Sequence, residues 1–296
     1  MRRWYVIAAP YLWLLLFFLV PFVIVFKISL SDIATAIPPY VPTLDLSSGW
    51  DGIKEFVSQL DFENYSFIFS DPLYIGAYWS SIKIAALSTL LTLLAAYPIA
   101  YGMARAPKEW QPTLMMLVIL PFWTSFLIRV YAWIGILKKE GLLNLFLTST
   151  GLVSEPLTIM NTSTAVYIGI IYSYLPFMIL PLYSSLEKIK PSLIEAAEDL
   201  GSPPWKAFWQ ITFPLSMPGI VAGCLLVFIP AVGEFVIPDL LGGSDTLMIG
   251  KTLWTEFFNN RDWPLASAVA VLLLLVLVIP IALFQRQQGQ RIEERT

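Results

Sequence analysis

Few residues in this chain have the chemistry of a binding site, and Glu234 is the most informative of them. It lies in the apolar segment PAVGEFVIPDLLGG. A carboxylate at membrane depth is costly unless it faces a cavity or a partner, so Glu234 is a candidate ligand for a cationic solute. A structural ion pair with Arg129 or Lys83 is the alternative interpretation. Asp239 follows Glu234 and is expected nearer the mouth of the same path.

Aromatic residues are dense in the segments expected at the depth of Glu234. Most aromatic rings in membrane proteins lie in belts at the interface with water, but a minority can hold an ammonium group through cation–π contacts. On this basis we select Trp123, Tyr131 and Tyr172 as candidates for the substrate path.

The composition excludes several kinds of site. The chain has no histidine, which removes Ser-His-Asp and Cys-His catalysis and H-E-x-x-H zinc sites. Its single cysteine, Cys224, provides neither a disulfide nor a metal cluster. A net charge of -3 without a basic run argues against nucleic acid. Gly250-Lys251-Thr252 lacks the first glycine of a phosphate loop. We therefore expect a chain that is not an enzyme, with no cofactor, metal or nucleotide of its own.

The elements that must position these residues are membrane helices. Of the 296 residues, 57% are hydrophobic and 13% charged, which is typical of a membrane protein. Lys and Arg are more frequent on the side that holds both ends of the chain, so the positive-inside rule places both termini in the cytoplasm. A polar, acidic insert at 31–72 is then periplasmic. The sequence predicts an all-α protein, a single transmembrane domain over 1–296, with six spans: 4–26, 74–103, 113–137, 163–185, 215–237 and 264–284.

The fifth predicted span carries Gly219-x3-Gly223. Small residues at this spacing allow two helices to approach closely in lipid. Helix packing is the favoured interpretation, and it is compatible with lining a translocation path.

The longest cytoplasmic polar interval is residues 188–214, KIKPSLIEAAEDLGSPPWKAFWQITFP. Ser192 and Glu195 form an S-x-x-E capping box, which predicts a helix starting at Leu193. This helix is too short to be stable alone and must dock on something.

The same interval contains the signals for a turn and a second helix. Gly201 lies where a left-handed C-cap is expected, and Pro203 and Pro204 prevent the first helix from continuing. Ser202 is the predicted cap of the second helix, with Pro203 at its first position. The interval is therefore predicted to be a compact helix-turn-helix.

The 188–214 interval resembles the cytoplasmic loop of permease subunits of binding-protein-dependent ABC importers. The family pattern E-A-A-x3-G-x9-I-x-L-P is met, with Phe213 in place of leucine, by Glu195, Ala196, Ala197, Gly201, Ile211 and Pro214. The resemblance implies the fold of a type I ABC importer permease. It also implies that this loop couples the chain to an ATPase subunit, which binds ATP and Mg. Glu195 either pairs with a basic residue there or only caps its helix.

Longer segments, 119–137, 228–243 and 248–270, look like permease subunits of polyamine ABC importers of the bacterial inner membrane, closest to the putrescine branch. This resemblance implies a heterodimer with a second homologous permease, a cytoplasmic ABC ATPase dimer and a periplasmic polyamine-binding protein, within membrane lipid. The cargo would be putrescine, with spermidine as a further candidate.

Three other functions stay open at this stage. An ion-coupled secondary transporter would show an inverted repeat and a proton-relay residue, and we see no convincing repeat. An intramembrane hydrolase would need a nucleophile and a base, which we do not find. An ABC permease for another small solute keeps the mechanism and changes only the cargo.

Overall fold

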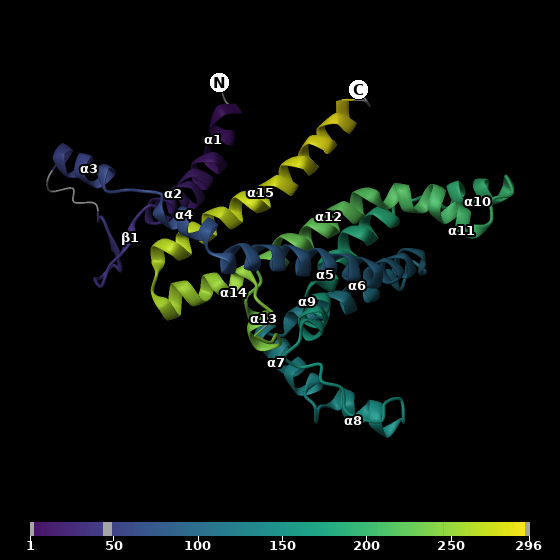
Figure 1. The fold of residues 1–296 in the computed structure, drawn as a ribbon. Coiled ribbons are helices and arrows are strands. Elements are labelled where there is room, and N and C mark those ends of the chain that lie inside the picture. Colours follow the sequence, from purple (N-terminus) through teal and green to yellow (C-terminus); the bar gives the residue numbers. More distant parts are fainter. Residues whose placement is uncertain (1–2, 44–48, 245, 294–296) are drawn as a thin grey trace. The chain divides into compact units, whose positions relative to one another are not determined.

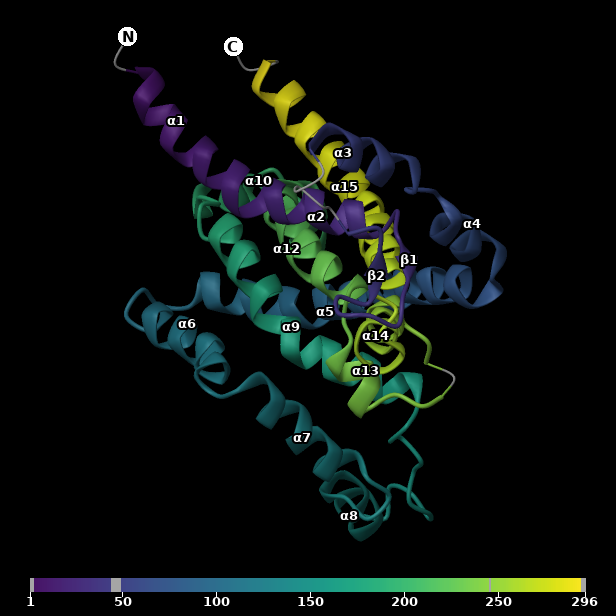
Figure 2. The same ribbon diagram turned by 90° about the vertical axis from the view of Figure 1, so that its left-hand side faces the viewer.

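A computed structural model describes residues 3–43, 49–244 and 246–293, which are mostly helical. The chain divides into two compact units, one formed by 1–77 with 252–296 and the other by 78–251. Figures 1 and 2 give two views of the ribbon.

The first unit contains the N-terminal helix, the polar insert and the C-terminal helix. The N-terminal helix is built from α1, a π-helical stretch (Leu15–Leu19) and α2. The other elements are a two-stranded antiparallel sheet and further helices. Their bounds are α1 Arg3–Leu14, α2 Val20–Ile28, β1 Asp32–Ile33, β2 Tyr40–Val41, α3 Gly49–Ser58, α4 Glu63–Ser70, a π-helical stretch Thr255–Asn260 and α15 Trp263–Glu293. Both α2 and α4 pack on α15.

The insert is tied to the end of α2 by polar contacts. The Nζ atom of Lys27 donates to the carbonyl of Pro42 at 2.7 Å and lies 4.2 Å from the centre of the Tyr40 ring. Asn64 donates to the backbone carbonyls of Ser29 and Ser31 at 3.1 and 2.8 Å. The acidic segment at 31–72 is therefore an ordered element within the described residues.

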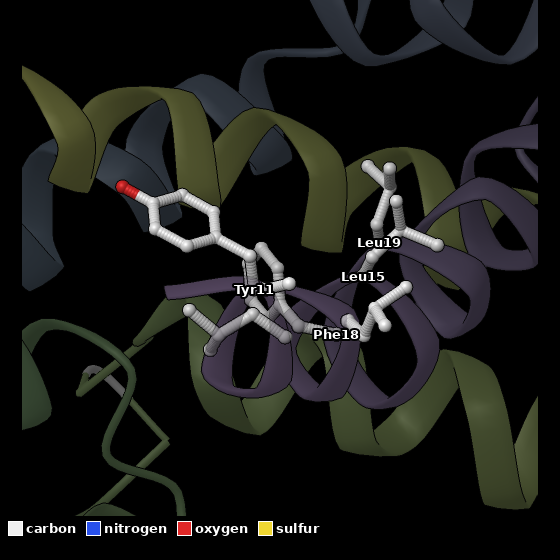
Figure 3. A pocket seen from close by; sticks show the side chains of 7 residues that line it. Tyr11, Leu15, Phe18 and Leu19 are labelled. Carbon is white, nitrogen blue, oxygen red and sulfur yellow. The ribbon is translucent and has the colours of Figure 1, made fainter. Parts of the chain in front are cut away.

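The N-terminal helix has an uncovered apolar face. Figure 3 shows Tyr11, Leu15, Phe18 and Leu19 around a hollow of about 480 Å³ that is lined by this helix alone. None of the residues in its 18-residue apolar window is buried within the chain. Such a face is expected against lipid or another membrane helix rather than water.

The second unit is built around a pair of long helices, α9 and α12, which lie side by side in Figures 1 and 2. The elements of this unit, together with the two helices that cross its boundary, are α5 Pro72–Arg105, α6 Gln111–Ile119, a 3-10 turn Leu120–Trp123, α7 Phe126–Leu137, α8 Leu142–Ser149, α9 Ser163–Leu186, α10 Pro191–Asp199, α11 Pro204–Ala207, a π-helical stretch Phe208–Thr212, α12 Phe213–Val232, α13 Val236–Leu240 and α14 Ile249–Trp254.

Close packing of α9 on α12 depends on glycine. A Cβ at Gly219 would lie 2.6 Å from the Pro181 carbonyl oxygen, and one at Gly223 would lie 2.6 Å from the sulfur of Met178. The prediction that Gly219-x3-Gly223 is a helix-packing surface is confirmed.

Four helices are long and apolar enough to cross a membrane: Ile7–Ile28, Pro72–Arg105, Ser163–Leu186 and Pro204–Val232. A fifth candidate is a helix pair, Gln111–Trp123 with Phe126–Ser149, bent by 88°. The apolar part of α15, Trp263–Ile279, is shorter. These positions correspond to the six predicted spans, whose number and orientation remain predictions.

Two predicted spans differ in form from the structure. The third, predicted as one helix over 113–137, is broken because Thr124 and Ser125 adopt extended backbone angles. The fifth, predicted over 215–237, begins earlier, at Pro204, and ends at Val232. Glu234 consequently lies just beyond the end of this helix rather than within it.

Candidate functional site

The 188–214 interval forms the predicted helix-turn-helix, with a different start for each helix. The first helix, α10, begins at Pro191, with Lys190 as its N-cap and no side-chain capping hydrogen bond. The predicted Ser192–Glu195 capping box is therefore wrong. Proline is favoured in the first turn, because its φ is preset and it has no N–H to satisfy, so the helix starts earlier than the serine suggests.

The turn after α10 is a complete Schellman motif. Gly201 has a φ of +81°, its N–H bonds the Glu198 carbonyl at 2.8 Å, and the N–H of Ser202 bonds the Ala197 carbonyl at 2.9 Å. This confirms the left-handed C-cap at Gly201. The second helix is capped by Pro203 and starts at Pro204, so the predicted cap at Ser202 is wrong.

The second helix of the loop continues into the membrane span. From Pro204 to Val232 the chain is one helix, with a π-helical stretch at Phe208–Thr212. Rings from this stretch pack on α5, with the Phe208 and Tyr97 rings 5.6 Å apart. Tyr97 also hydrogen-bonds Ser216 at 3.0 Å. A force applied to the loop would therefore be passed to α5 and α12 together.

The six motif residues have different exposures in this loop. Glu195, Ala196, Gly201 and Pro214 are exposed, whereas Ala197 and Ile211 are half-buried. Glu195 is exposed, so its carboxylate is accessible from outside the chain. Figure 1 shows α10 and α11 at one end of α9 and α12, with α13 towards the opposite end.

Glu234 lies at that opposite end, in the short connection between α12 and α13. Its side chain is only 7% exposed. One carboxylate oxygen, Oε2, accepts a hydrogen bond of 2.5 Å from the Tyr174 hydroxyl. The other, Oε1, accepts the backbone N–H groups of Val236 and Ile237 at 3.1 and 3.4 Å. All of its partners are neutral, so its negative charge is not cancelled by a side-chain cation.

Glu234 lines a cavity of about 620 Å³ within the second unit, here called the Glu234 cavity. Rings, hydroxyls and one guanidinium surround it. Its lining consists of Phe122, Thr124, Phe126, Arg129, Ser173, Tyr174, Phe177, Pro230, Gly233, Glu234, Phe235 and Val236.

Arg129 lines the same cavity without pairing with Glu234. Its guanidinium donates to the carbonyl of Pro121 and, at 3.5 Å, to that of Thr124. It lies over the rings of Phe122 and Phe126, at 5.3 and 6.0 Å from their centres. Arg129 thus bonds carbonyls left free where the third span breaks. Among the described residues, neither Arg129 nor Lys83 forms the predicted alternative ion pair with Glu234.

The other predicted path residues lie outside the lining of the Glu234 cavity. Asp239 forms an ion pair with Lys251 at 3.3 Å. Trp123 is 75% exposed and Tyr131 is 56% exposed. Tyr172 packs edge-on against Trp133, with ring centres 5.4 Å apart. A role of these four residues in the substrate path stays a prediction.

Sequence reasoning selected Tyr172 and passed over Tyr174. Two positions apart on a helix, their side chains point about 200° apart, to nearly opposite faces. Only the face with Tyr174 meets Glu234. Ser173 was also missed, because a lone serine in an apolar helix gives no sequence signal. The arrangement as a whole can bind an ammonium group, since it offers hydroxyls, aromatic faces and a carboxylate that is hydrogen-bonded only to neutral groups.

The family model described as "Binding-protein-dependent transport system inner membrane component" matches residues 4–294. The chain belongs to this family. Among its relatives, the spermidine/putrescine transport system permease protein PotB of Haemophilus influenzae is 39% identical over 280 residues, covering 95% of this chain and 92% of the relative. PotB of Escherichia coli K12 is 43% identical over 224 residues, covering 76% and 81%.

The fold agrees with this membership. A crystal structure of a bacterial ABC transporter involved in alginate import contains a chain with a TM-score of 0.68. It is 17% identical, and the match covers 98% of this chain and 97% of that one. This likeness shows the predicted fold of an ABC importer permease. As an inner membrane component of a transport system, the chain is a membrane subunit rather than an enzyme.

Proposed function

We propose that this chain is the transmembrane subunit of an ATP-driven importer that carries polyamines, putrescine and also spermidine, across the inner membrane by alternating access. The observation that carries the proposal is the buried Glu234 carboxylate with only neutral partners, facing a cavity walled by aromatic rings. A cation needs such groups to replace its lost hydration. The names of the PotB relatives support the same cargo.

The energy enters through a partner in this proposal. An ABC ATPase dimer in the cytoplasm binds ATP and Mg and grips the 188–214 loop. Closure of that dimer moves α10 and α11, and the continuous helix from Pro204 to Val232 carries the motion toward Glu234. The proposal includes six spans with both termini in the cytoplasm, which would put the loop on the same side of the membrane as the ATPase.

Two further partners complete the proposed assembly. A second, homologous permease covers the exposed apolar face of this chain and closes the path. A periplasmic polyamine-binding protein docks on the outer segments, including the acidic insert at 31–72, and releases the cargo. The acidity of these segments would raise the local concentration of a polycation.

A second candidate cargo is an anion, since Arg129 lines the same cavity. Its Nε atom is buried without a hydrogen-bond partner among the described residues. In this case Arg129 would be the ligand, and Glu234 would only repel the cargo.

The two cargoes are separated by ATPase stimulation. The complete complex in lipid nanodiscs is mixed with binding proteins loaded with putrescine, spermidine or an oxyanion. The proposal predicts stimulation by the polyamine-loaded proteins and its loss in Glu234→Gln. If only the oxyanion-loaded protein stimulates the ATPase, and this stimulation is unchanged in Glu234→Gln, the cargo is an anion.

A further inference from the structure

Ser173 has a buried hydroxyl that no described residue satisfies. The residue is 6% exposed, its Oγ atom has no hydrogen-bond partner, and it lines the Glu234 cavity. A serine within a helix can usually bond a carbonyl of the preceding turn, so a buried hydroxyl left without a partner marks a position where a ligand would complete the bonding.

Three oxygen atoms on Glu234 and α9 in the lining of this cavity can accept a further hydrogen bond. They are the Oε2 atom of Glu234, the hydroxyl oxygen of Tyr174 and the Oγ atom of Ser173. Oε2 accepts only the Tyr174 hydroxyl at present, and a carboxylate oxygen has two lone-pair sites, so one site remains. The Tyr174 hydroxyl donates a hydrogen bond to Glu234, and its oxygen keeps its lone pairs as acceptors. A primary ammonium group has three donors and no acceptor, which matches this set.

Arg129 limits the charge that the same cavity can hold. Its guanidinium is always protonated, and it is fixed by the carbonyls of Pro121 and Thr124. Glu234 and Arg129 together are neutral, so one bound ammonium leaves the cavity with a single positive charge. A second ammonium in the same cavity would meet two like charges and one opposite charge, which opposes its entry.

We propose that this chain binds one terminal ammonium group of the cargo through Glu234, Ser173 and Tyr174, while Arg129 keeps further ammonium groups out of the cavity. This inference rests on the proposed function and adds the groups of this chain that hold one end of the cargo.

The first test measures the KM for uptake of putrescine and of spermidine by the complete complex in proteoliposomes. Ser173→Ala removes one hydrogen bond to a charged group, so we expect KM to rise roughly tenfold for both cargoes with their ratio unchanged. Ser88→Ala is the matched control, because the Ser88 hydroxyl is also buried and has no partner among the described residues but lies outside the cavity lining. It should leave both KM values unchanged.

The second test changes the charge at Arg129. Arg129→Gln keeps donors for the carbonyls and loses the charge, whereas Arg129→Lys keeps the charge. We expect Arg129→Gln to lower the KM for spermidine relative to putrescine, and Arg129→Lys to leave the ratio as in the wild type. Basal ATPase activity and co-purification of the partner subunits report whether each variant is assembled.

The outcomes separate a failure of this inference from a failure of the proposed function. The inference would be overturned if Ser173→Ala changed the ratio of the KM for spermidine to that for putrescine, or if this ratio were equal in the two Arg129 variants. Uptake of polyamines by the wild type would still support the proposed function in that case. An effect of Ser88→Ala as large as that of Ser173→Ala would also overturn the inference. If the wild-type complex takes up neither polyamine, the proposed function itself fails and the inference falls with it.

Discussion

The Gly201 turn offers a quantitative test of the coupling loop. Gly201 and Gly151 close two helices in the same way. Each has a positive φ, +81° and +71°, and each begins a Schellman motif with the same pair of backbone hydrogen bonds. A Cβ at either glycine would meet no atom within 4 Å. The cost of alanine at either position is therefore conformational rather than steric.

This cost is the same at both sites, about 1–2 kcal/mol for an L-residue in the left-handed region. At about 1.4 kcal/mol per factor of ten, Gly201→Ala should lower the equilibrium constant for closing the turn at least about fivefold, on the order of tenfold. Gly201→Asn should lose less, because asparagine tolerates this conformation better than alanine. Gly151→Ala should disturb its own turn equally, but that turn follows α8 and is not part of the 188–214 loop.

The assay is the number of cargo molecules imported per ATP hydrolysed in proteoliposomes that contain the complete complex. We expect this ratio to fall several-fold in Gly201→Ala, to recover partly in Gly201→Asn and to stay at the wild-type value in Gly151→Ala. Equal losses in both alanine variants, or no loss in Gly201→Ala, would refute the role given to the loop.

Three further predictions concern stability and are measured as melting temperatures in detergent. Gly219→Ala forces a Cβ to 2.6 Å from the Pro181 carbonyl oxygen and should cost about 1–3 kcal/mol, whereas Gly102→Ala, with open space around it, should be neutral or stabilising. Asn144→Ala removes a buried side chain that makes three hydrogen bonds to the 138–157 backbone and should cost about 1–3 kcal/mol; an unchanged melting temperature would contradict this. Burial, and then the nearby negative charge of Glu256, raise the pKa of Asp262, so the folded state binds a proton more tightly than the unfolded state. Stability should therefore rise as pH falls from the raised pKa towards 3.8. Asp262→Asn should flatten this pH dependence, and an unchanged slope would exclude Asp262 as its source.

Features set by local backbone chemistry were predictable from the sequence. The positive φ of Gly201 follows from the need for a left-handed residue after a helix that two prolines prevent from continuing. The close approach of α9 and α12 follows from the spacing of Gly219 and Gly223. The membrane class follows from composition alone. The starts of α10 and α11 were missed by one or two residues, because a proline in the first turn competes with a serine cap.

Features set by tertiary contacts were not predictable. The third span contains Pro121 and the polar pair Thr124–Ser125, but α9 and α12 continue through prolines of their own, so proline alone does not predict a break. The span breaks at Thr124–Ser125, where Arg129 bonds carbonyls freed by the break. Glu234 was predicted to be a functional carboxylate, but its partner is a tyrosine and not a cation. Which of two nearby tyrosines meets Glu234 depends on the rotation of α9, and that rotation is fixed by packing in space rather than by the local sequence.

The most direct test of the central claim is uptake by a reconstituted complex. This chain, its partner permease and the ATPase are placed in proteoliposomes with radiolabelled putrescine or spermidine and the loaded binding protein outside. The account predicts accumulation only with ATP available to the ATPase subunits, and its loss when this chain carries Glu234→Gln. Accumulation without ATP, or uptake by this chain alone, would contradict it.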